Sequence, residues 1–177
     1  MRRFLDRLYS WSGALAALCV FAIFALMLAQ AFGRELGILV RGADDIVAWL
    51  CAAASFLALG RTFRHGELVR VGLWLDHLGP GGRRTMELFA LGVTAAFVAY
   101  MLWAVTRFVH DSYQFNEVAQ GLLRVPIWIP QLSLVIGIAI FLVALIDELI
   151  TVLRKEKPTY QRAEEARAAA GDFSEKL

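Results

Sequence analysis

Residues 61–84 read RTFRHGELVRVGLWLDHLGPGGRR and separate two long apolar stretches before them from two after them. The segment holds five arginines: Arg61, Arg64, Arg70, Arg83 and Arg84. A basic segment between two pairs of membrane helices is expected on the cytoplasmic side, because Lys and Arg are retained there. The stretch therefore predicts a membrane protein built from two helical hairpins, and it sets their topology.

The flanking apolar stretches have lengths that suit membrane helices. Apolar residues make up 59% of the 177 positions and charged residues 19%, against about 25% charged in soluble domains. Charges are missing from residues 8–33, 46–60, 88–106 and 125–146. A helix needs about 20 residues to cross the hydrocarbon core, so the second stretch spans only if Asp44 and Asp45 form its first turn and Arg61 lies in its last. We expect an all-α membrane protein with spans at about 9–32, 44–63, 84–107 and 126–153.

The distribution of basic residues predicts the orientation of these spans. With four spans, 14 of the 18 Lys and Arg residues fall on one side of the membrane and 4 on the other. The positive-inside rule then places both termini and the 61–84 segment in the cytoplasm. Omitting the short second span would spoil this alternation. We therefore predict a four-helix membrane domain, residues 1–157, followed by a polar cytoplasmic tail, residues 158–177.

The middle segment also carries an amphipathic pattern. Leu68, Val71, Leu75 and Leu78 recur at helical spacing, which predicts a short helix over residues 67–78 lying along the inner membrane surface. The Gly-Pro-Gly-Gly run at 79–82 should end this helix and turn the chain. We expect the following side chains to anchor the chain in the lipid headgroup region and to fix topology: Arg61, Arg64, Arg70, Arg83, Arg84 and Trp74.

Small residues in the first two spans would let neighbouring helices approach closely. Gly13 and Ala17 share a face of the first span, whose main polar side chain is Gln30. In the second span the packing candidates are Ala48, Ala52 and Ser55.

The acidic pair Asp44-Asp45 has two interpretations. Carboxylates in a first turn complement the helix dipole and can cap free amide groups. The alternative is a polar contact with a partner protein. Cys19 and Cys51 are lone cysteines in separate spans, and we expect both to be buried packing residues.

Motifs of catalysis and cofactor binding are missing from the sequence. There is no Walker loop, nucleophile elbow or H-E-x-x-H motif. His65, His77 and His110 all fall in predicted loops, which argues against a haem held between facing histidines. No charged residue lies near the middle of any span, where a chain that carried solute or ions alone would normally need one. We predict that the chain is no enzyme, has no catalytic, cofactor-binding or metal site, and does not bind nucleic acid.

Residues 58–71, ALGRTFRHGELVRV, resemble the segment after the second helix of the small membrane subunit of TRAP transporters, the DctQ type. Leu68 stands where that pattern commonly has His and Gly72 where it has Asp, so roles of those side chains do not carry over. The matching positions are Arg61, Arg64, Gly66, Arg70 and Val71.

Two further segments strengthen the resemblance. The acidic start of the second span, Asp44-Asp45, is similar to the family's usual Glu pair. The start of the fourth span is similar to the family's fourth-helix entry through Pro126, Trp128, Pro130 and Gln131.

The resemblance implies a subunit of a tripartite ATP-independent periplasmic transporter in the bacterial inner membrane. In such a system a periplasmic binding protein captures an organic acid, and a large membrane subunit moves it by using an ion gradient. The small subunit is expected to scaffold the large one, so the implied partners are the large subunit, the binding protein and membrane phospholipids. The alternative is a self-sufficient, homo-oligomeric small transporter or channel.

Overall fold

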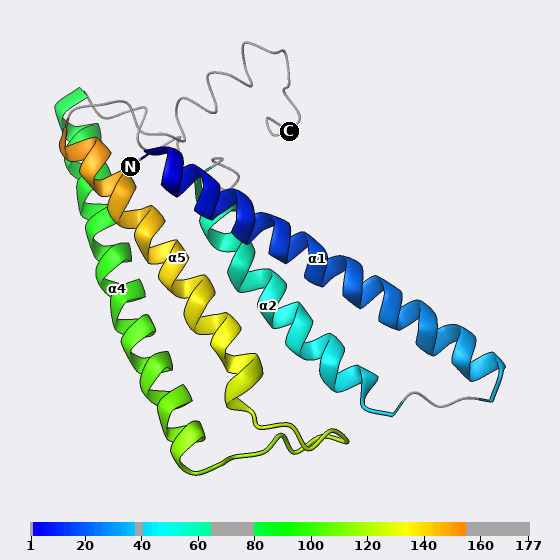
Figure 1. Ribbon diagram of the computed structural model, residues 1–177. Helices are drawn as coiled ribbons and strands as arrows, with labels where there is room; N and C mark the ends of the chain where they lie inside the picture. Colours follow the sequence, from blue (N-terminus) through cyan, green and yellow to red (C-terminus); the bar gives the residue numbers. More distant parts are fainter. Residues whose placement is uncertain (1, 38–40, 65–79, 155–177) are drawn as a thin grey trace, which may run out of the picture.

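The computed structural model describes residues 2–37, 41–64 and 80–154. In these ranges the chain forms four helices (Figure 1): α1 (Arg2–Glu35), α2 (Ala43–Arg64), α4 (Pro80–Gln114) and α5 (Trp128–Leu153). Apart from one isolated antiparallel bridge between Val118 and Pro126, the described residues contain no β-structure. The prediction of an all-α fold with four long helices is confirmed.

All four helices are long and apolar enough to cross a membrane. The second apolar stretch, residues 46–60, is too short by itself, and it reaches the required length because charged residues extend the helix at both ends, as the sequence predicts. The 22 residues of α2 include Asp44 and Asp45 in the first turn and Arg61 in the last. Its charged side chains are thus confined to the two ends of the span, where they can reach the headgroup region.

Two helices run well beyond the predicted spans. α1 begins at Arg2 rather than near residue 9, and α4 covers 80–114 rather than 84–107. A helix satisfies its backbone hydrogen bonds internally in water as in lipid, so it continues through polar residues until a local signal ends it. α4 starts at Pro80, a residue suited to the first helical position, and stops before Asn116, which has a left-handed φ of 50°.

These limits correct two expectations. Residues 80–82 do not turn the chain, because they already belong to the first turn of α4. His110 does not lie in a loop, because α4 continues past it to Gln114. The fourth helix begins at Trp128, two residues after the predicted start at Pro126.

The four helices lie in a row in the order α1, α2, α5, α4 (Figure 1). α2 packs against α1 on one side and α5 on the other, and α5 packs against α4. We call the end of the row that holds the start of α1 and the end of α5 the terminal end, and the other the opposite end. Since α1 and α4 are edge helices, they expose large apolar side chains such as Phe21, Phe24, Phe89 and Phe97.

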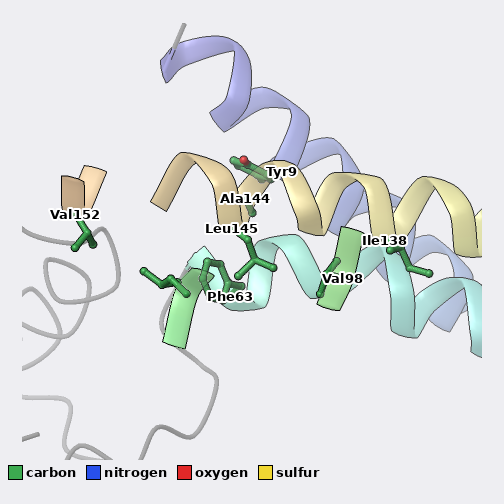
Figure 2. Close-up of a cluster of buried hydrophobic side chains, with 8 residues drawn as sticks. Tyr9, Phe63, Val98, Ile138, Ala144, Leu145 and Val152 are labelled. Atoms are coloured by element: carbon green, nitrogen blue, oxygen red, sulfur yellow. The ribbon is translucent and has the colours of Figure 1, made fainter. Parts of the chain in front are cut away.

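The main apolar core begins at the terminal end and extends along the helix axes towards the midpoint of the helices (Figure 2). Phe63 of α2 and Phe141 of α5 meet edge to face there, with ring centroids 5.6 Å apart, an arrangement that aromatic rings prefer. All four helices contribute to the buried set: Tyr9, Phe63, Leu91, Val98, Ile138, Ala144, Leu145 and Val152.

Two glycines let α2 and α5 approach each other closely. A Cβ atom on Gly137 would lie 2.6 Å from the carbonyl carbon of Phe56, and one on Gly60 would lie 3.0 Å from Cγ2 of Ile140. The first contact involves backbone, which cannot rotate away as a side chain can. Close backbone approach at small residues is a common way to pack helices in lipid.

The face of α2 that packs inside the chain is not the predicted stripe. Ala48 and Ser55 are exposed and Ala52 is half-buried, so the packing role that we predict for them concerns something outside this chain. The face that is buried consists of Ala43, Ala53, Ala54, Leu57, Gly60 and Phe63.

The prediction that both cysteines are buried is wrong within this chain. Cys51 is exposed and Cys19 half-buried. Cys51 precedes Gly60 by nine residues, which is about two and a half turns, and it therefore points to the other side of α2.

Candidate functional site

The predicted site residues fall into three groups in the structure. Arg61 and Arg64 lie at the terminal end, whereas Asp44, Asp45 and the start of α5 lie at the opposite end. Arg83 and Arg84 belong to the first turns of α4. Outside the described residues lie the predicted helix 67–78, the tail 158–177, and Gly66, Arg70, Val71 and Trp74.

At the terminal end, Arg64 ties the end of α2 to the start of α1. Its Nη2 atom forms an ion pair with Oδ1 of Asp6 at 2.8 Å. The guanidinium carbon also lies over the ring of Tyr9, 4.9 Å from the ring centroid, within the range of cation–π attraction. The side chain of Arg64 is only 19% exposed, so the structure gives this arginine partners within its own chain.

Helix α5 brings two carboxylates to the same place. Asp147 and Glu148 lie near enough to Tyr9 to act on it electrostatically, and Glu148 is 3% exposed. Among the described residues, the Tyr9 hydroxyl and Nη1 of Arg64 are buried and have no hydrogen-bond partner. The terminal end is therefore a charged junction of α1, α2 and α5, in which Arg64 joins the first two helices.

Arg61 differs from Arg64 in its surroundings. Its side chain lies across α1 at Gly13, where an added Cβ atom would clash with Cδ of the arginine. Arg61 is exposed, and no ion pair joins it to any carboxylate in the described part of the chain. Of the two arginines in the last turn of α2, Arg61 is therefore the one whose charge is open to an outside partner.

At the opposite end, the acidic pair contacts two other elements. The side-chain amide of Gln30 donates to Oδ1 of Asp44 at 3.0 Å and so joins α1 to α2. Oδ2 of Asp45 accepts from the backbone N–H groups of Leu122 and Leu123, at 2.9 and 3.3 Å. The two carboxylates thus link elements of the same chain, a role that neither interpretation of the sequence included.

The residues that Asp45 holds belong to the connection between α4 and α5, residues 115–127. The connection folds back on itself through backbone hydrogen bonds from Ala119 N–H to Val125 C=O and from Ile127 N–H to Glu117 C=O, at 2.9 and 3.0 Å. The hydroxyl of buried Ser112 donates to Oε2 of Glu117 at 2.9 Å. Gly121 leaves room for the Asp45 carboxylate, since a Cβ atom on this residue would clash with it.

The predicted fourth-helix entry follows the connection directly. Pro126 pairs with Val118 in the isolated bridge, and Pro130 falls in the first turn of α5, where a missing N–H costs little. The rings of Trp128 and Tyr113 meet edge to face at 5.5 Å and join the start of α5 to the end of α4. Gln131 has a buried side-chain oxygen without a hydrogen-bond partner in the described residues.

Removing the Asp45 carboxylate is expected to loosen the connection. In Asp45→Ala, amide hydrogen exchange at Leu122 and Leu123 should accelerate about tenfold or more, because a hydrogen bond to a charged acceptor contributes about 1.5–3 kcal/mol. Asp44→Ala is the matched control, since it removes only the bond from Gln30. Equal acceleration at these two amides in both variants would show that Asp45 has no specific part in holding them.

Within residues 2–37, 41–64 and 80–154, no group of three or more His, Cys, Asp or Glu side chains is placed to hold a metal ion. Charged residues are absent from the central part of every span. The polar contacts at both ends join helices to one another, which is a positioning role.

These features define a class: a multi-pass membrane protein whose polar residues serve to place its helices. The sequence model of the family described as "Tripartite ATP-independent periplasmic transporters, DctQ component" matches residues 23–155, from within α1 to just after α5. The chain belongs to this family and is a small membrane component of a TRAP transporter. Searches of curated proteins and of solved structures found no match.

Two contacts of the site were not predicted from the sequence. The sequence contains a signal for the hydrogen bond between Gln30 and Asp44. A polar side chain near the end of one apolar span is followed by the acidic start of the next helix. The sequence contains no such signal for the hydrogen bond between Leu122 and Asp45. The two residues are 77 positions apart, and the donor is a backbone amide, which every residue type except proline has.

Proposed function

We propose that this chain braces the large membrane subunit of a TRAP transporter, which takes up an organic acid with the energy of an ion gradient. A periplasmic binding protein would deliver the acid. In this arrangement the chain lies in the bacterial inner membrane with both termini in the cytoplasm, in line with its 14 basic residues on the side of the termini.

The observation that carries the proposal is the placement of the charged groups. Transport sites for ions and acids in a membrane need charged or strongly polar groups deep in the bilayer. In this chain the described charges lie at the helix ends, where Arg64 and Asp45 are used to hold helices and the connection in place. A chain with this distribution is suited to positioning another subunit, and that subunit would supply the transport site.

The open row of helices supports the same conclusion. α1 and α4 each have a helix neighbour on one side only (Figure 1), so broad apolar surfaces remain for a partner. Ala48 is an exposed small residue on α2, and small residues favour close approach of a partner helix.

The test is purification of the tagged full chain from its own host in a mild detergent. We expect a large membrane subunit to co-purify, and uptake in reconstituted vesicles to require both subunits and the binding protein. Ala48→Trp should reduce the amount of co-purified large subunit several-fold without changing the thermal stability of the isolated chain, because Ala48 has open space around it. Uptake by vesicles that contain this chain alone would refute the proposal and favour the homo-oligomeric alternative.

A further inference from the structure

An open groove runs between α1 and α2 and has a volume of 560 Å³. We call it the α1/α2 groove. It is hollow because most of its lining side chains are small. Those that matter here are Gly13, Ala17 and Val20 from α1, and Ser55, Ala58 and Arg61 from α2.

Contacts beneath the groove hold its two walls at a fixed distance. The hydroxyl of Ser12 donates to the backbone carbonyl of Leu57, and both residues are buried. Ala16, Ala53 and Leu57 pack together in a small apolar cluster. The floor is thus formed by residues of this chain, while the space above it is open to the surroundings.

The groove has a charged end and an apolar end. Arg61 lies at the terminal end, where its stem crosses α1 at Gly13. Val20 lies seven residues further along α1, about 10 Å deeper into the span. No carboxylate lines the groove, and the described residues offer Arg61 no ion pair, in contrast to Arg64, which Asp6 neutralises.

This polarity matches a phospholipid lying along the helices. An arginine at the edge of the hydrocarbon region needs an anion, and the guanidinium group binds phosphate oxygens in a bidentate manner. The groove leads from that charge towards the bilayer centre, which is the direction of an acyl chain. An apolar helix of another subunit would fill the groove but leave the charge of Arg61 without a counter-ion.

We infer that the α1/α2 groove is a specific binding site for an anionic phospholipid, with its phosphate on Arg61 and one acyl chain between α1 and α2. Gly13 leaves room for this arrangement, because a Cβ atom there would displace the Arg61 side chain from its position across α1. The site does not depend on the scaffold role proposed above.

The experiment uses the full chain, purified in mild detergent, stripped of lipid and titrated with dioleoyl phosphatidylglycerol under native mass spectrometry. Arg61→Gln is expected to weaken binding about tenfold or more, because the bidentate contact with phosphate is lost. Ala17→Phe should weaken it as strongly by filling the groove while leaving Arg61 intact. Arg34→Gln is the matched control, since it removes the same charge from the opposite end of α1 and should leave binding unchanged.

Two further ligands separate the contributions of phosphate and acyl chain. Dioleoylglycerol has the chains without the phosphate, and glycerol phosphate has the phosphate without the chains; each should bind at least about tenfold more weakly than the phospholipid. Equal binding of phosphatidylglycerol to the native chain and to Arg61→Gln would overturn the inference. So would a complex in which Ala17→Cys cross-links to the large subunit and no phosphatidylglycerol is retained, because the groove would then be a protein interface.

Discussion

Gly137→Ala is expected to destabilise the protein, although alanine is the better helix former. The added Cβ atom would lie 2.6 Å from the carbonyl carbon and 2.7 Å from the carbonyl oxygen of Phe56. Relief requires α2 or α5 to move as a whole, and overpacking of this kind costs about 1–3 kcal/mol. A thermal unfolding curve of the detergent-purified chain should shift to lower temperature, and Gly137→Leu should shift it further.

Gly92→Ala is the matched control for this substitution. It changes the same residue type in the same way within a helix, but beyond the nearby backbone of its own helix no atom lies within 4 Å of the added Cβ. The higher helix propensity of alanine should then raise stability by up to about 1 kcal/mol. The two substitutions are therefore expected to have opposite signs, and equal shifts in one direction would refute the close approach of α5 to α2 at Phe56.

A second-site change provides a further check on the geometry. Truncating Phe56 to alanine removes its ring but leaves the backbone atoms and the Cβ atom that crowd Gly137. Phe56→Ala should therefore fail to restore the stability of Gly137→Ala. Full recovery in the double variant would mean that the ring, rather than the backbone, limits the approach of the helices.

Arg64→Gln is expected to give the second large effect, a loss of about 1–3 kcal/mol in stability. Three contributions add to this figure: the ion pair with Asp6, the cation–π contact with Tyr9 and the packing of a half-buried side chain. Arg64→Lys should recover only part of the loss, because an ammonium group lacks the planar surface that lies over the ring. The measurement is again thermal unfolding in detergent.

Asp6→Asn separates the ion pair from the other two contributions. The Asp6 side chain is 56% exposed, and exposed ion pairs contribute about 0–1 kcal/mol, so this substitution should cost much less than Arg64→Gln. Arg61→Gln is the control for loss of positive charge at the same end and should leave stability nearly unchanged. A loss in Asp6→Asn as large as that in Arg64→Gln would assign the whole effect to the ion pair and none to the stacking on Tyr9.

At each end of α2, a charged side chain contacts another element of the chain. Arg64 fixes its last turn to α1, and Asp45 in its first turn holds the connection that precedes α5. α2 is also the helix that packs against both α1 and α5. The segment 61–84 thus begins inside a helix that packs against a neighbour on each side, so the backbone that carries Arg61 and Arg64 is held in place.

The number of long apolar helices could be predicted because it depends on composition along one dimension. A charge-free stretch of sufficient length must be a helix in lipid, where backbone groups have no other partners. Even the second span, with 15 residues free of charge, was predicted correctly once Asp44 and Asp45 were counted as its first turn. The helix ends in water were less predictable, and α4 runs seven residues beyond its predicted end at 107 because nothing before Asn116 stops it.

The sequence could not predict which side of each helix packs against its neighbours, and the reason is physical. In a soluble helix the buried side is the apolar side, but a membrane helix is apolar all round and its composition gives no such signal. The stripe of Ala48 and Ser55 looked as suitable for packing as the one that contains Ala54 and Gly60. Only the crossing of α2 with its neighbours decided between them.

By itself, the sequence determined four membrane helices, the family, and the absence of charge from the centre of each span. These follow from hydropathy and charge, which act on each stretch separately. The tertiary structure decided the order of the helices in the row, the separate roles of Arg61 and Arg64, and the link from Asp45 to the connection. Those features depend on which backbones approach within a few ångströms, and residues as distant as Asp45 and Leu122, or Gly13 and Arg61, become neighbours only when the helices pack.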